Sequence, residues 1–143
     1  MPPHKMASRL SSASQPPPIH VAKGTGCEWC SAWVEHLRTE GFIVTEDELY
    51  GMLLISYKLE NGIPQRMTSC HTGKIDGYMI EGHVPAVDIH RVLQDRPDAI
   101  GLVVPGMLYR FPGMGDETDR DTYGVFLIVR DGATSVFTSY PGA

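Results

Sequence analysis

The sequence predicts a single α/β domain, because extended and helical apolar patterns alternate along the chain and the composition suits one hydrophobic core. The chain has 143 residues, of which 42% are hydrophobic and 20% are charged. These values are typical of an ordinary globular protein. Turns rich in glycine and proline separate the patterned segments, which indicates short elements joined by tight connections.

The first half of the domain is predicted to run strand, helix, strand, helix. Ile19–Lys23 is a short apolar segment between turn residues, which favours a strand. Cys30–Glu40 places apolar residues at i, i+3, i+4 and i+7, the spacing of one helix face. Phe42–Leu49 alternates like a strand, and Met52–Leu59 resembles a second helix that stops before an Asn-Gly pair.

The second half is predicted to contain a hairpin, a helix and another hairpin. Residues 69–84 form two short extended runs joined by Asp76-Gly77, a strong two-residue hairpin signal. Pro85 opens a helix that ends before Pro97. Residues 122–130 and 134–140 alternate on either side of Asp131-Gly132, which indicates a C-terminal hairpin. The predicted apolar side of the helix consists of Val87, Ile89, Val92 and Leu93.

This order of elements predicts a thioredoxin-like fold with an additional C-terminal β-hairpin. In that architecture a CxxC motif lies at the start of the first helix, and the loop that enters the first hairpin lies against it. The loop contains Cys70 and His71, so we expect them beside Cys27 and Cys30. Residues 1–18 are rich in Ser and Pro and are predicted to be a disordered N-terminal arm. Residues 19–143 form the predicted domain.

Charge and hydropathy exclude two classes of partner. The formal net charge is −5 and there is no basic run, so no nucleic acid is expected. No segment approaches the roughly 20 apolar residues of a membrane span, so no membrane insertion is expected. The N-terminal segment lacks the apolar run of an export signal, which leaves both a cytoplasmic protein and a mature exported domain open. The sequence shows no recognisable catalytic triad, phosphate-binding loop or pair of catalytic carboxylates, so we predict no catalytic residues.

The cysteines carry the chemistry that the sequence predicts. Cys27 and Cys30 form a CxxC pair, for which disulfide exchange, metal binding and a structural disulfide all stay open. Three cysteines are an odd number, which favours reactive or metal-binding thiols. With Cys70 and His71 they make a soft donor set suited to Cu(I) or zinc. Adjacent residues of a strand face opposite sides, which weakens a four-ligand zinc site that uses both Cys70 and His71.

Two methionines and one histidine are further candidates. Met107 and Met114 each follow a Pro-Gly turn, where a thioether could reach a metal. Packing is the preferred explanation of this segment taken alone, and only the other soft donors favour a metal role. His83, just before the helix that Pro85 opens, is either an outer-shell partner or ligand, or a hydrogen-bonded structural residue. Trp33 has helical spacing from Cys30 and is predicted to lie in the core.

The runs TSCHT and GYMIEGHVPA, with CSAWVEHLRTEGF, RPDAIGLVVPGM and FPGMG, closely resemble the CopG-type periplasmic copper-resistance proteins, from about residue 19 to residue 140. The resemblance implies a thioredoxin-like fold, a periplasmic location and copper binding through clustered cysteines. It assigns metal binding to Cys27, Cys30 and Cys70, while further matching positions have less defined roles. These further positions are His71, Met107 and Met114. Trp29 stands where the family commonly has a third cysteine in its Cys-Gly-Cys-Cys motif.

Three functions follow as hypotheses. The first is a non-enzymatic copper-binding protein of copper resistance, with Cu(I)/Cu(II) as the metal and copper ions and other copper-handling proteins as partners. The second is a thiol-disulfide oxidoreductase in which Cys27 is the nucleophile and Cys30 the resolving thiol. The third is a structural domain that binds zinc instead of copper.

Overall fold

The computed structural model describes residues 16–24, 28–64, 71–104 and 123–140. The predicted metal ligands Cys27, Cys70, Met107 and Met114 lie outside these ranges, as does most of the predicted N-terminal arm. Cys30 and His71 lie inside them. No helix in the described part of the chain is long and apolar enough to cross a membrane.

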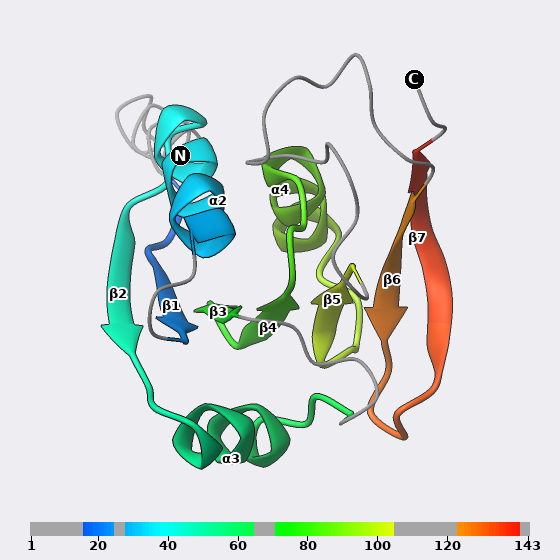
Figure 1. Cartoon of the computed structure of the whole chain (residues 1–143). Helices are drawn as coiled ribbons and strands as arrows, with labels where there is room; N and C mark the ends of the chain where they lie inside the picture. Colours follow the sequence, from blue (N-terminus) through cyan, green and yellow to red (C-terminus); the bar gives the residue numbers. More distant parts are fainter. Residues whose placement is uncertain (1–15, 25–27, 65–70, 105–122, 141–143) are drawn as a thin grey trace, which may run out of the picture.

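One mixed sheet forms the centre of the domain (Figure 1). Its seven strands follow the order β2-β1-β3-β4-β5-β6-β7. The β1/β2 and β4/β5 neighbours are parallel, and all other neighbouring strands are antiparallel. The strands are β1 (Ile19–Lys23), β2 (Val44–Glu48), β3 (His71–Ile75), β4 (Tyr78–Glu81), β5 (Gly101–Val103), β6 (Tyr123–Ile128) and β7 (Thr134–Tyr140).

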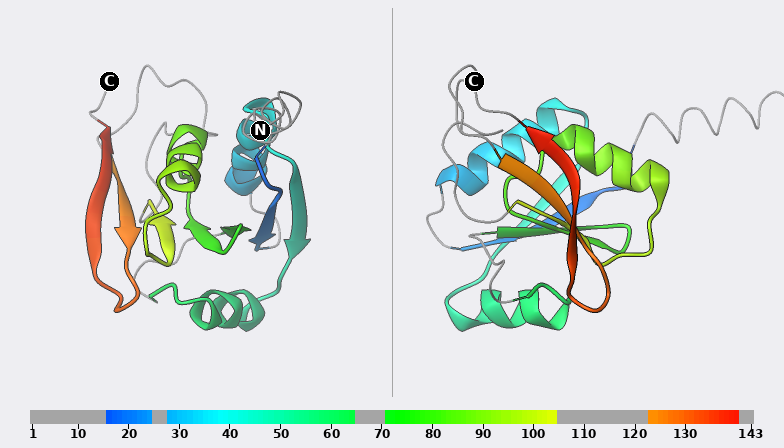
Figure 2. Two further views of the ribbon diagram at one scale, coloured as in Figure 1. Left: turned by 180° about the vertical axis from the view of Figure 1, so that it is seen from behind. Right: turned by 90° about the vertical axis from the view of Figure 1, so that its right-hand side faces the viewer.

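Helices cover both faces of the sheet. Helices α2 (Glu28–Thr39) and α4 (Ala86–Asp95) lie on one face, and α3 (Met52–Glu60) lies on the other (Figures 1 and 2). The two-residue alternation of the strands divides the apolar side chains between two layers. In β4, Ile80 joins the core beneath α2 and α4, whereas Met79 joins the smaller core on the α3 side.

Most predicted elements are present, with boundaries that differ by a few residues. The mixed α/β class is confirmed, and so are the hairpins at Asp76-Gly77 and Asp131-Gly132. Positive φ angles of 48° and 89° at Asp76 and Gly77 are those of the turn that such a pair favours. The thioredoxin-like assignment stays a prediction.

Four details differ from the prediction. The first helix begins at Glu28, two residues before the predicted start. The strand predicted over 42–49 is shorter, and four of its five side chains are exposed because β2 is an edge strand. Val87, predicted on the apolar side of its helix, is 63% exposed. The sequence analysis did not predict the short strand β5, which has only three residues.

Candidate metal site

Cys30 lies in the first turns of α2 and is completely buried. It is disulfide-bonded, and its partner lies outside the described residues, since the other two cysteines are Cys27 and Cys70. The first turns of α2 therefore place a buried sulfur atom close to the start of β3. Of the two cysteines in the CxxC pair, Cys30 is within the described residues, and the arrangement of the pair stays a prediction.

His71 is the first residue of β3, and its ring faces Cys30. The distance from His71 Nδ1 to Cys30 Sγ is 3.1 Å, although the two residues are 41 positions apart in sequence. A disulfide sulfur carries no proton, so Nδ1 is the donor in this hydrogen bond. The predicted meeting of the CxxC helix and the hairpin loop is thus observed for one residue from each.

Two aromatic rings hold the imidazole of His71 in place. Trp33 stacks on it, with a centroid distance of 4.6 Å and an interplanar angle of 29°. The ring of His83, on the segment after β4, has its centroid 4.9 Å from the centroid of the His71 ring. Trp33 is buried in the core, as predicted, and its Nε1 donates a 2.8 Å hydrogen bond to the carbonyl of Val84. The same tryptophan therefore packs against His71 and fixes the segment that carries His83.

Burial keeps the His71 imidazole neutral. Burial, together with the proximity of His83, lowers the pKa of His71 from the ordinary 6.5 to about 3. A hydrogen bond with the backbone at Gly82 acts in the opposite direction. A neutral imidazole can donate a lone pair to a metal without first losing a proton, so His71 is ready for coordination at any ordinary pH.

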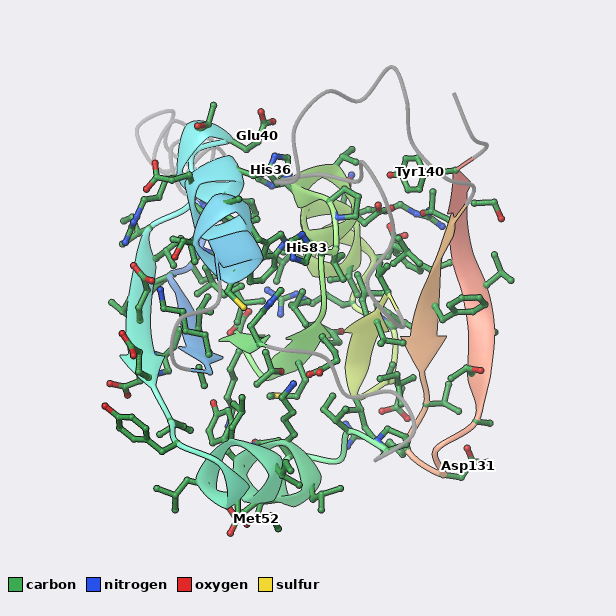
Figure 3. All side chains as sticks on the ribbon, viewed as in Figure 1. His36, Glu40, Met52, His83, Asp131 and Tyr140 are labelled. Carbon is green, nitrogen blue, oxygen red and sulfur yellow. The ribbon has the colours of Figure 1, made fainter. Side chains whose placement is uncertain are left out.

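His83 is closer to the candidate site than its sequence context indicated. The side chain is 1% exposed and lies between α2 and α4 above the sheet (Figure 3). It belongs to the same aromatic cluster as His71 and Trp33. The sequence signal was its position after β4, the strand that pairs with the strand carrying His71.

A buried ion pair on the α3 face of the sheet was not predicted. The Nζ atom of Lys58 in α3 lies 2.5 Å from Oε2 of Glu81 in β4, and both side chains are at most 1% exposed. Lys58 Nζ also donates a 3.4 Å hydrogen bond to the carbonyl oxygen of His71. The only sequence signal was a charged residue within each of two apolar segments, MLLISYKLE and YMIE.

The described residues account for two of the six predicted metal ligands, Cys30 and His71, and bring them together. Within the described ranges, no group of three His, Cys, Asp or Glu side chains is arranged to hold a metal ion. A complete site would therefore need donors from residues outside those ranges. Once the disulfide at Cys30 is reduced, this pair would fit a soft metal, since it would then offer a thiolate sulfur and a neutral imidazole nitrogen.

The fold and the site define a small α/β protein with a cysteine–histidine pair buried at a helix start. Two solved structures are similar to it over nearly the whole chain. A structure named copper resistance protein CopG, form 1, has 42% sequence identity and a TM-score of 0.82, and the match covers 90% of this chain and 100% of that one. Form 2 has 42% identity and a TM-score of 0.79, with 89% and 100% covered.

The chain belongs to the CopG family of copper resistance proteins, given this identity over the full length of the solved chains. Residues 67–114 also match a family model described as a protein of unknown function, DUF411. No curated protein matches the chain.

Proposed function

We propose that this protein binds copper as Cu(I) through its clustered cysteines and acts in bacterial copper resistance. The observation that carries the proposal is the buried sulfur of Cys30 lying 3.1 Å from the neutral imidazole of His71, in a chain 42% identical to copper resistance protein CopG. We also propose the thioredoxin-like fold for the domain. The proposed donors are Cys27, Cys30, Cys70, His71, Met107 and Met114.

The chemistry of these donors supports Cu(I). Thiolate and thioether sulfur are soft ligands that favour Cu(I), and imidazole accepts both oxidation states of copper. Trp29 takes the place of one family cysteine, which leaves three thiolates for the site. Zinc is the alternative metal for such a set.

The disulfide at Cys30 must be reduced before that sulfur can act as a thiolate ligand. The reduction takes two electrons from a dithiol reductant, breaks the sulfur–sulfur bond and yields two thiols, while the reductant becomes a disulfide. Each thiol then loses its proton on binding the metal. Copper loading should therefore depend on the thiol state, because the disulfide would persist in the oxidising periplasm that we propose as the location until a reductant acts on it.

The test is anaerobic titration of the reduced protein with Cu(I), followed by the ultraviolet charge-transfer absorbance between thiolate and metal. We expect tight binding in the wild type and its loss in Cys30→Ser. The matched control is Ser31→Ala, on the exposed side of the same helix, which should bind Cu(I) as the wild type does. Equal binding by wild type and Cys30→Ser would refute the proposal.

A second function is favoured by one observation, namely that Cys30 is disulfide-bonded. A thiol-disulfide oxidoreductase needs a disulfide at the start of a helix, where backbone N–H groups stabilise a thiolate. Catalysed reduction of insulin by dithiothreitol, abolished in Cys27→Ser, would support this function. No acceleration over the uncatalysed reaction would leave copper binding as the better account.

A further inference from the structure

The ion pair between Lys58 and Glu81 lies directly under the strand that presents His71. Lys58 reaches across from α3 to contact two strands at once: the side chain of Glu81 on β4 and the main-chain carbonyl of His71 on β3. The two strands are in register here, with Thr72 opposite Glu81. Glu81 in turn stands two residues before His83.

Stability alone does not explain why this pair is charged. Removing two charges from water costs several kcal/mol per ion, and apolar residues of similar volume often replace a buried pair with no loss of stability. The surroundings are suited to such a replacement, because Met79, Val103 and Ile63 form an apolar core on the same face. The charged groups must instead supply something that apolar side chains lack.

What the charged pair adds is a directional hydrogen bond to the main-chain carbonyl of His71. An ammonium group can donate to a carboxylate and to a carbonyl at the same time, and Lys58 does so with Glu81 and with His71. A methionine at this position would fill the space without holding the carbonyl. The ring of His71 faces Cys30 on the other side of the sheet, so a shift of this carbonyl would change the direction in which the ring points.

We propose that Lys58 and Glu81 are positioning residues that fix His71 for metal coordination. This inference rests on the proposed copper-binding function, and it adds residues that do not touch the metal. Groups that orient a metal ligand commonly change metal affinity about 10- to 100-fold when they are removed. We expect an effect of that size on Cu(I) affinity.

The experiment compares the wild type with the double variant Lys58→Met, Glu81→Leu. Histidine-labelled protein gives the ring ¹⁵N signals of His71 in the metal-free, disulfide-bonded state. Competition with a chromophoric Cu(I) chelator gives the affinity of the reduced protein. The matched control removes an exposed pair, Arg130→Gln with Asp98→Asn, whose side chains are 71% and 85% exposed.

The expected result is a folded double variant with shifted His71 ring signals and an affinity at least 10-fold weaker, while the control variant matches the wild type. Unchanged His71 signals in a folded double variant would overturn the proposal. If the double variant does not fold, Lys58→Gln decides, since the shorter side chain gives up the ammonium contact with the carbonyl of His71 while its amide can still hydrogen-bond to Glu81: shifted signals support the proposal and unchanged signals overturn it. Failure of both variants to fold would make the pair a folding requirement, which also overturns it.

The two readouts separate this proposal from the copper proposal. If the wild type binds no Cu(I), the proposed function fails, but the His71 signals of the metal-free protein still report whether Lys58 and Glu81 orient the ring. If the wild type binds Cu(I) and the His71 signals do not respond, copper binding stands and the positioning role fails.

Discussion

The region around His71 and the region around Asp88 both bury polar side chains, but the chemistry of those side chains differs. Around His71, a cysteine sulfur and a second histidine meet beside Trp33. Around Asp88, on the other helix of the same face, a carboxylate accepts hydrogen bonds from two hydroxyl groups of β7, at 2.5 Å from Thr138 and 2.6 Å from Tyr140. Both regions are buried, but only the first contains soft donors.

The difference shows that burial of polar atoms does not by itself indicate a functional site. Each oxygen of the Asp88 carboxylate has a hydroxyl donor on the C-terminal hairpin, and Arg91 adds a 2.9 Å bond to the carbonyl of Phe137. These contacts anchor β7 to α4 and involve hard oxygen atoms. The chemistry of the donors, namely sulfur and neutral imidazole, distinguishes the region around His71.

The largest expected loss of stability comes from Asp88→Ala, which tests whether the region around Asp88 is independent of the region around His71. The substitution leaves the hydroxyls of Thr138 and Tyr140 without their charged acceptor, so the free energy of unfolding should fall by about 2 to 3 kcal/mol. Chemical denaturation measures the loss, and Cu(I) affinity should stay within twofold of the wild type. Asp88→Asn is the control, since it keeps one carbonyl oxygen and should lose less. A large loss of Cu(I) affinity in Asp88→Ala would show that the two regions are coupled.

The sequence predicted the region around His71 better than the region around Asp88. The CxxC pair, the Asp76-Gly77 turn and the histidine at the start of the hairpin are local signals, and a known order of elements brings them together. No role was predicted for Asp88, because its partners are 50 and 52 residues away. Pairings over such distances leave no local pattern.

The same reason explains why Lys58 and Glu81 were missed. Each residue is a single charge in an apolar segment, and nothing in either segment states that the two charges meet across the α3 face. Val87 was wrongly predicted in the opposite sense, since it was expected on the apolar side of its helix and is exposed. Its spacing matched the apolar side of α4, but the hairpin that covers this helix contacts Asp88 and Arg91 instead, and Val87 stays exposed.

A smaller effect is expected from Gly73→Ala, which tests the packing of the ring that stacks on His71. A Cβ atom at residue 73 would lie 2.7 Å from Cδ1 of Ile19 and 3.3 Å from the ring of Trp33. The free energy of unfolding should fall by about 1 to 2 kcal/mol, and the ring signals of His71 should shift. Asp88→Ala should leave those signals in place, which separates the two regions in one spectrum.

The double variant Gly73→Ala with Ile19→Val is the control for this packing prediction. Valine lacks the Cδ1 atom that the new methyl group meets first. The two substitutions should therefore destabilise the protein by less than the sum of their separate effects. Additive effects would contradict the predicted contact, because they would mean that the methyl group is accommodated elsewhere.

At neutral pH the smallest effect is a pH dependence of stability that belongs to His71, because it develops only as the pH falls. Burial lowers its pKa from the ordinary 6.5 to about 3, so between these two pH values the unfolded chain binds a proton that the folded protein does not. Stability from this residue is therefore lost as the pH falls from 6.5 toward 3, by at most about 1.4 kcal/mol per pH unit, and it does not change with pH above that window. Denaturation of the wild type and His71→Asn between pH 4 and pH 8 measures the difference, because the variant lacks this proton. Parallel stability curves below pH 6 would show that the folded protein protonates His71 as easily as the unfolded chain does, and the imidazole would then no longer be held neutral for a metal.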